Sequence, residues 1–195
     1  MDEEIIQTAI LIIAAVLIYV LARRLKFKND KTLKVNYKYE FSKLLFIVYI
    51  VGLLGVLLIP VIRMGYSNNN GFYCHIVTYD WDYNLVPFRT ISEQFQLLTG
   101  GSKDESRNGL LNLFVNSCLF IPFPAIIKFA FQKLKALYCF LIPFASIILC
   151  EFLQYIPGRR SDIDDVILNT IGLLVGMIIL LLVQNKNFFK TQSEN

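Results

Sequence analysis

The sequence predicts an all-α protein, a polytopic bundle of about five transmembrane helices with a short interfacial amphipathic helix in an external loop. Hydrophobic residues make up 55% of the chain and charged residues only 17%, whereas soluble domains average roughly 45–50% and 25%. The apolar residues fall in blocks of about 18 or more, long enough to cross about 30 Å of hydrocarbon as helices. The five blocks are Ile5 to Ala22, Leu44 to Ile62, Leu110 to Phe131, Ala136 to Ile156 and Ile163 to Val183.

Basic residues between the blocks predict how the chain is oriented. The linker that follows Ala22 is strongly basic, and further lysines cluster at 128–135 and 186–190. Because cytoplasmic loops are enriched in Lys and Arg, we expect a multi-pass protein of the cell membrane with its N-terminus outside and its C-terminus in the cytoplasm. The net charge of +4 then reflects orientation, and we expect no nucleic-acid partner. The predicted parts are a first helix with its basic linker (1–43), a membrane core (44–183) and a polar tail (184–195).

Composition gives no reason to expect a resident metal or cofactor. His75 is the only histidine, and the four cysteines show no CxxC spacing, so neither a zinc site nor a disulfide framework is expected. The first apolar block follows Asp2, Glu3 and Glu4 rather than basic residues. A removable signal peptide normally begins with positive charge, so we interpret this block as a retained helix.

The long loop from Arg63 to Asn108 is expected outside the membrane. Its first part, residues 65–75, is rich in Asn and Gly and predicts an irregular surface turn. Thr90 and Glu93 have the spacing of a capping box, and the apolar residues that follow predict a short amphipathic helix ending at Gly100. This helix could be a simple cover or a lid over a site. The polar segment from Ser102 is expected to be mobile.

The third block contains paired amides and two prolines. Asn112 and Asn116 are four residues apart and so share one helix face. They could form hydrogen bonds between helices or contact a ligand. Pro122 and Pro124 should kink or interrupt the helix.

The fourth and fifth blocks meet at a hairpin with carboxylates and amides just inside both ends. Glu151 and Gln154 lie near the end of the fourth block. Ser161 and Asp164 have capping-box spacing, which places Asp164 and Asp165 in the first turn of the fifth helix. Along that helix one continuous stripe holds Asp165, Asn169, Gly172 and Gly176. The two glycines form a GxxxG pair, so we expect another helix to approach closely on the same face as the polar groups.

These polar residues predict a wet pocket in the outer half of the membrane, because ionisable groups in a span normally face a cavity or a protein interior. Arg159 and Arg160 occupy the hairpin against the orientation rule, which indicates either ion pairs with neighbouring acids or a ligand contact. The candidate ligand-binding residues are Arg89, Asn112, Asn116, Glu151, Gln154, Arg159, Arg160, Asp162, Asp165 and Asn169.

These segments resemble the VanZ family of small bacterial membrane proteins, named for a member associated with teicoplanin resistance. The similar segments are NLVPF at 84–88, NLFVNSCLFIPFP at 112–124, EFLQ at 151–154 and RRSDIDDVILNTIGLLVG at 159–176. Family members more often have Pro-Leu-Gly where this chain has Pro122 to Pro124, so the local kink is expected to differ. The resemblance spans about Leu44 to Val183. It implies a cell-envelope protein with a role in tolerance of lipoglycopeptides such as teicoplanin, and it supplies no established reaction.

Three functions stay open on this basis. In the first, the protein is not an enzyme and binds a membrane lipid, a lipid-linked wall precursor or a lipoglycopeptide, with arginines gripping phosphate. In the second, it is a membrane enzyme acting on an envelope lipid or peptidoglycan precursor, with Glu151 and Asp165 as acid and base, or with Mg²⁺ or Ca²⁺ held by Asp162, Asp164, Asp165 and Glu151. In the third, the polar groups only join helices and the protein acts through a partner.

Overall fold

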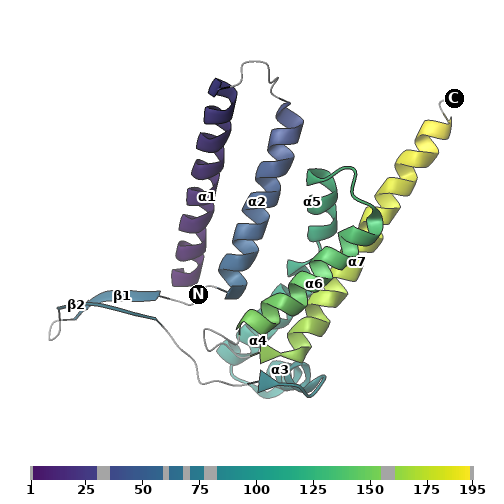
Figure 1. The fold of residues 1–195 in the computed structure, drawn as a ribbon. Coiled ribbons are helices and arrows are strands. Elements are labelled where there is room, and N and C mark those ends of the chain that lie inside the picture. The colour runs from purple at the N-terminus through teal and green to yellow at the C-terminus, as the bar shows by residue number, and fades with distance from the viewer. Residues whose placement is uncertain are drawn as a thin grey trace. The chain divides into compact units, whose positions relative to one another are not determined.

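The computed structural model describes residues 2–29, 36–58, 62–67, 71–76, 83–154 and 161–193, and most of them are helical (Figure 1). The described residues fall into two compact units, Met1–Trp81 with Leu153–Arg159, and Asp82–Phe152 with Arg160–Asn195. The elements in chain order are α1 (Asp2–Asn29), α2 (Tyr37–Leu58), β1 (Ile62–Ser67), β2 (Gly71–Ile76), β3 (Tyr83–Asn84), α3 (Arg89–Gly100), α4 (Lys103–Leu119), α5 (Phe123–Ala130), α6 (Ala136–Gln154), β4 (Ser161–Asp162) and α7 (Ile163–Ser193).

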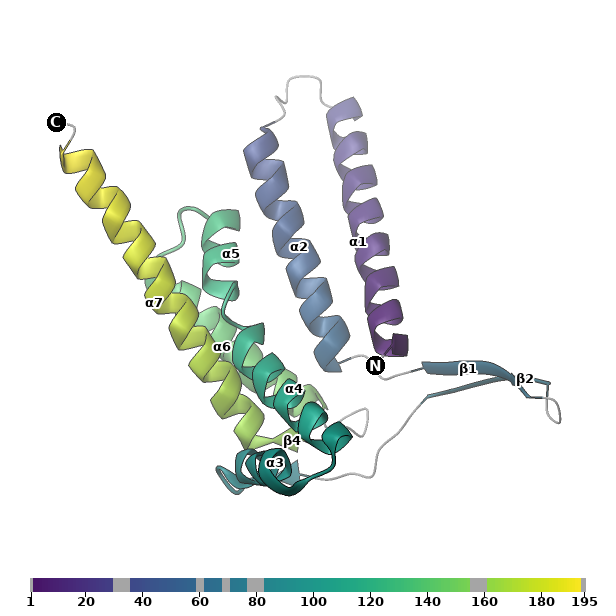
Figure 2. The ribbon, with the colours of Figure 1, turned by 180° about the vertical axis from the view of Figure 1, so that it is seen from behind.

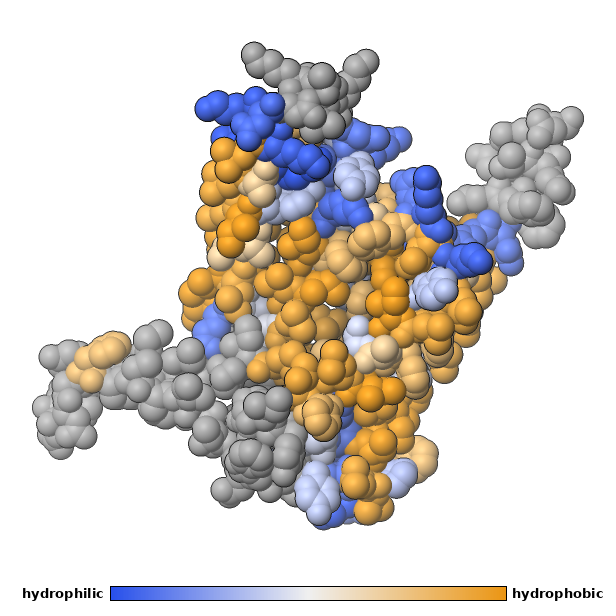
Figure 3. All heavy atoms as spheres, in the orientation of Figure 1, coloured by the Kyte–Doolittle hydropathy of each residue, from blue (hydrophilic) through white to orange (hydrophobic). Residues whose placement is uncertain are grey.

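Five helical segments are long and apolar enough to cross a membrane, which confirms the predicted all-α class and its five spans. They are Ile5–Asn29, Tyr37–Leu58, Lys103–Ala130, Ala136–Gln154 and Ile163–Asn185. Apolar side chains cover the middle of α1 in Figure 3, and hydrophilic side chains gather near the end that leads to α2. Several helices extend past the apolar blocks into polar sequence, because Lys, Arg and Glu are themselves good helix formers.

In the first unit, α1 and α2 lie side by side and antiparallel (Figures 1 and 2). Glu40 joins them near their connection, since its carboxylate accepts hydrogen bonds from the Tyr19 hydroxyl (2.7 Å) and from the Arg23 guanidinium. Further along, Gly55 lies against Thr8, so a Cβ added at this glycine would be only 2.7 Å from the Thr8 methyl carbon.

The prediction of an irregular turn at residues 65–75 is wrong, because most of these residues form a β-hairpin. Strands β1 and β2 pair antiparallel, with Arg63 opposite His75 and Tyr66 opposite Phe72. The Asn-rich part at 68–70, which motivated the prediction, lies outside the described residues. The flanking segments carry the aromatic and β-branched residues that favour strands.

In the second unit, α4 and α7 pack side by side, with α5 also against α7 and α3 against α4 (Figure 2). The predicted interruption of the third span is confirmed, since α4 ends at Leu119 and α5 begins at Phe123. The predicted close approach at the GxxxG pair is confirmed too. A Cβ added at Gly172 would collide with the Ser117 carbonyl oxygen, and one at Gly176 with that of Ile121.

Two predictions about helix starts are wrong, because local spacing does not show which partner a side chain selects. Helix α3 begins at Arg89 with no cap from its own side chains. The polar segment from Ser102, for which no helix start was predicted, begins α4 with a complete capping box between Ser102 and Glu105. At α7 the cap comes from Asp162, whose carboxylate accepts a hydrogen bond from the Asp164 backbone N–H, rather than from Ser161.

Candidate functional site

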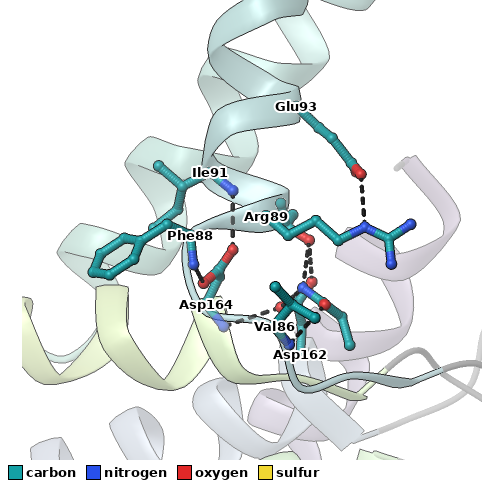
Figure 4. Close-up of polar contacts among 9 residues, drawn as sticks. Val86, Phe88, Arg89, Ile91, Glu93, Asp162 and Asp164 are labelled. Atoms are coloured by element: carbon teal, nitrogen blue, oxygen red, sulfur yellow. Dashed lines mark hydrogen bonds and ion pairs between the residues drawn. The ribbon is translucent and has the colours of Figure 1, made fainter.

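Asp164, in the first turn of α7, caps the N-terminus of α3 (Figure 4). Its side chain is fully buried. One carboxylate oxygen accepts a hydrogen bond from the Phe88 backbone N–H (2.5 Å) and the other from that of Ile91 (3.1 Å). The first N–H groups of a helix have no partner within it, and a carboxylate there is favoured by the helix dipole. Asp164 therefore fixes the position of α3 on α7.

Asp162 joins the same two regions through side-chain donors. Its carboxylate accepts hydrogen bonds from the Asn84 amide (2.9 Å) and the Thr90 hydroxyl (2.5 Å). The short strands β3 and β4 pair in parallel here, with Asn84 opposite Asp162. In addition, the Asp162 backbone N–H donates to the carboxylate of Glu151 on α6. These contacts form a buried polar junction between β3, α3, α6 and α7. Its residues are Asn84, Thr90, Glu151, Asp162 and Asp164.

Glu151 is buried at the end of α6, where its carboxylate accepts the hydrogen bond from the Asp162 backbone N–H. Within the part of the chain that the structure describes, no three His, Cys, Asp or Glu side chains form a group that could hold a metal ion. The acids named for Mg²⁺ or Ca²⁺ in the enzyme hypothesis therefore do not form such a group.

Asp165 points to a different neighbour from Asp164. Its carboxylate accepts a hydrogen bond from the Asn116 amide on α4 (2.5 Å). One turn further along α7, Asn169 is only 4% exposed, and its side-chain oxygen has no hydrogen-bond partner among the described residues. Asn169 lies on the α7 stripe between Asp165, which contacts Asn116, and Gly172, which contacts Ser117. This α4–α7 polar face (Asn116, Asp165, Asn169) thus holds an acceptor without a donor.

The remaining candidate residues are dispersed. Arg89 is 56% exposed and its guanidinium pairs with Glu93 of the same helix (3.0 Å). Asn112 is exposed on α4, whereas Gln154 is buried at the end of α6. Arg159 and Arg160 lie outside the described residues.

Sequence reasoning missed Asn84, which is 1% exposed and bonds to both Asp162 and Thr90. Its only signal was its position at the start of the NLVPF segment. The role of Thr90 was also missed, because its spacing to Glu93 suggested a local cap. In fact the Thr90 hydroxyl donates to an aspartate 72 residues away.

The residues of the polar junction and of the α4–α7 polar face lie within one region of the chain that a family model matches. A model of the VanZ/LLP1 family matches residues 46–184, which is most of the chain. The chain belongs to the VanZ/LLP1 family. The match confirms the resemblance drawn from the sequence, and it includes every residue of the polar junction and of the α4–α7 polar face. Helix α1 lies outside the VanZ/LLP1 match. No curated protein and no solved structure matches the chain.

Proposed function

We propose that this VanZ/LLP1 protein binds the polar headgroup of an envelope lipid or of a lipid-linked wall precursor at the α4–α7 polar face. By binding that headgroup, the protein contributes to tolerance of lipoglycopeptides such as teicoplanin. The observation that carries the proposal is the buried Asn169 oxygen, which has no donor among the described residues. A buried acceptor without a hydrogen bond costs about 1–3 kcal/mol, so a ligand that donates to it gains affinity.

The chemistry of the face indicates the kind of group it would take. Asn169 offers a neutral oxygen, and one turn away Asp165 offers a carboxylate that is only partly buried. Both are acceptors, so the complementary group carries N–H or O–H donors, such as an ammonium or sugar hydroxyls. An ionisable group inside a span is by default a candidate functional residue, which supports the assignment.

The neighbouring acids are less suited to this role. Asp164 and Asp162 accept hydrogen bonds from α3 and β3, and Glu151 accepts one from the Asp162 backbone. Binding a ligand through them would require breaking the junction. A phosphate contact from Arg159 and Arg160 stays a prediction, as does the orientation that would open the site to the outer leaflet.

The test compares Asn169→Leu and Asp165→Asn with Ser146→Ala. Ser146 is a suitable control because it also lies in a span but bonds only to Ile142 of its own helix. Each full-length variant is expressed in a strain lacking the native protein, and teicoplanin susceptibility and co-purified lipids are measured by growth inhibition and mass spectrometry. We expect the two site variants to lose a headgroup class and to raise susceptibility, while the control behaves as the parent. Equal lipid content in all variants at normal protein level would refute the proposal.

A further inference from the structure

A short turn between β3 and α3 exposes an unusual run of apolar side chains. Leu85 is 70% exposed, Val86 58% and Phe88 63%, and Pro87 is exposed as well. Turns normally use Gly, Pro, Asn, Asp or Ser, so Leu85, Val86 and Phe88 depart from the usual turn residues whereas Pro87 does not. Four consecutive exposed apolar residues therefore call for a partner.

The backbone of this apolar turn (Leu85–Phe88) is held firmly from the opposite side. The Val86 N–H donates to the Asn84 side chain (3.1 Å), and the Phe88 N–H donates to Asp164. Phe88 also has a φ of 65°, which a bulky residue rarely adopts because its Cβ crowds the backbone. Figure 4 shows the Phe88 ring directed away from Asp162, so the polar junction fixes the turn with its apolar side outward.

The apolar turn lies beside the first turn of α7, which is the start of a candidate membrane span. Asp164 lies in the first turn of α7, and the apolar segment of that helix begins at Ile163. α3, which continues from the turn, packs against α4, whose Leu110 and Phe114 are exposed apolar residues of another span. The turn therefore leads into a helix that packs against one candidate membrane span, and it is hydrogen-bonded to the first turn of another. Tyr83 and Arg89, both exposed, flank the turn, as amphipathic residues do at a membrane boundary.

We infer that the apolar turn inserts into the boundary between lipid headgroups and acyl chains, where it anchors β3 and α3 to the membrane surface. The partner that covers the exposed apolar side chains of the turn is the lipid bilayer. The boundary of a bilayer lies at the ends of the spans, where this turn is found. An interface with a second copy of the chain or with another protein has no such requirement. This inference is independent of the proposed headgroup site, because none of its residues belongs to the α4–α7 polar face.

Fluorescence of a single tryptophan tests the inference. Trp81 is the only tryptophan of the chain, so Trp81→Phe supplies a silent background for Val86→Trp, with Leu85→Trp as a second reporter. Phe114→Trp on α4 is the control for a span, and Lys133→Trp in the exposed α5–α6 connection is the control for water. Each full-length variant is reconstituted in phosphatidylcholine and phosphatidylglycerol vesicles. The lipids are brominated either near the headgroup end of the acyl chain or near its terminal methyl.

We expect both turn reporters to be quenched roughly twofold or more by shallow bromine and less by deep bromine, as for a segment about 5–10 Å into the boundary. Lys133→Trp should be insensitive to both lipids, and thermal melts should match the parent. If neither turn reporter responds to bromine while Phe114→Trp does, the inference is overturned, whether water or protein covers the turn.

Discussion

Asp164 and Asp165 are adjacent in sequence, yet the structure uses them differently. Asp164 is fully buried and accepts hydrogen bonds from two backbone N–H groups of α3, whereas Asp165 is partly exposed and meets one amide of α4. Successive helical residues point about 100° apart, so Asp164 faces the turn before α3 and Asp165 faces α4. The comparison teaches that two neighbouring acids at the start of α7 serve different contacts, Asp164 the turn and α3, and Asp165 the amide of Asn116 on α4.

Removing Asp164 should have the largest effect. Asp164→Ala leaves the Phe88 and Ile91 N–H groups without an acceptor, at a cost of about 2–4 kcal/mol for the pair. Hydrogen exchange of the peptide covering 83–100 should accelerate strongly in purified protein. Asp165→Ala serves as the matched change on the next residue and should leave that peptide protected. If hydrogen exchange of the peptide 83–100 were equally fast in both variants, the claim that only Asp164 holds α3 would be contradicted.

The Asp165 side of α7 depends on close approach to α4, and Gly172 tests that dependence. Gly172→Ala places a Cβ against the Ser117 carbonyl, and such overpacking costs about 1–3 kcal/mol. Gly100→Ala is the control, because nothing lies within 4 Å of its added Cβ. Thermal unfolding in detergent should show a lower midpoint for the first variant and no loss for the second. A harmless Gly172→Ala would contradict the described helix contact.

The sequence predicted most features that depend on one helix at a time. Apolar block length located the five spans, the prolines marked the break after Leu119, and the periodicity of Asp165, Asn169 and Gly172 identified the face toward α4. It failed chiefly where partners come from distant segments, although it also missed the local Ser102–Glu105 capping box and the β1–β2 hairpin. Local spacing assigned Thr90 to its own helix, whereas its hydroxyl bonds to Asp162. Similarly, α3 is capped by Asp164, which no rule based on neighbouring residues could indicate.

Substitution of Asn116 should lower stability less than Asp164→Ala or Gly172→Ala does. Asn116→Leu removes the donor to Asp165, and hydrogen bonds between membrane helices average about 0.6 kcal/mol. We expect a modest drop in thermal midpoint, with no change in exchange at 83–100. Ser117→Ala provides the comparison, since its hydroxyl bonds within α4 to Leu113. Faster exchange of α3 in Asn116→Leu would show that the polar junction and the α4–α7 polar face are one unit.

Arg89 should matter least for stability. Arg89→Gln breaks an exposed pair with Glu93 on one helix, and such pairs contribute about 0.3–0.5 kcal/mol. The thermal midpoint should stay close to that of the parent, with Glu93→Gln giving the same result. A large drop in the thermal midpoint of either variant would show that this ion pair supports the polar junction, contrary to the prediction.

The most direct test of the central claim is a crystal structure of the protein purified with its native lipids. The account predicts density for a headgroup with a donor atom within hydrogen-bonding distance of the Asn169 side-chain oxygen or the Asp165 carboxylate, and an intact junction at Asp164. A headgroup seated instead on Asp162 and Asp164, with α3 displaced, would contradict it. So would a dry α4–α7 contact in which the Asn169 oxygen accepts from another residue of the chain.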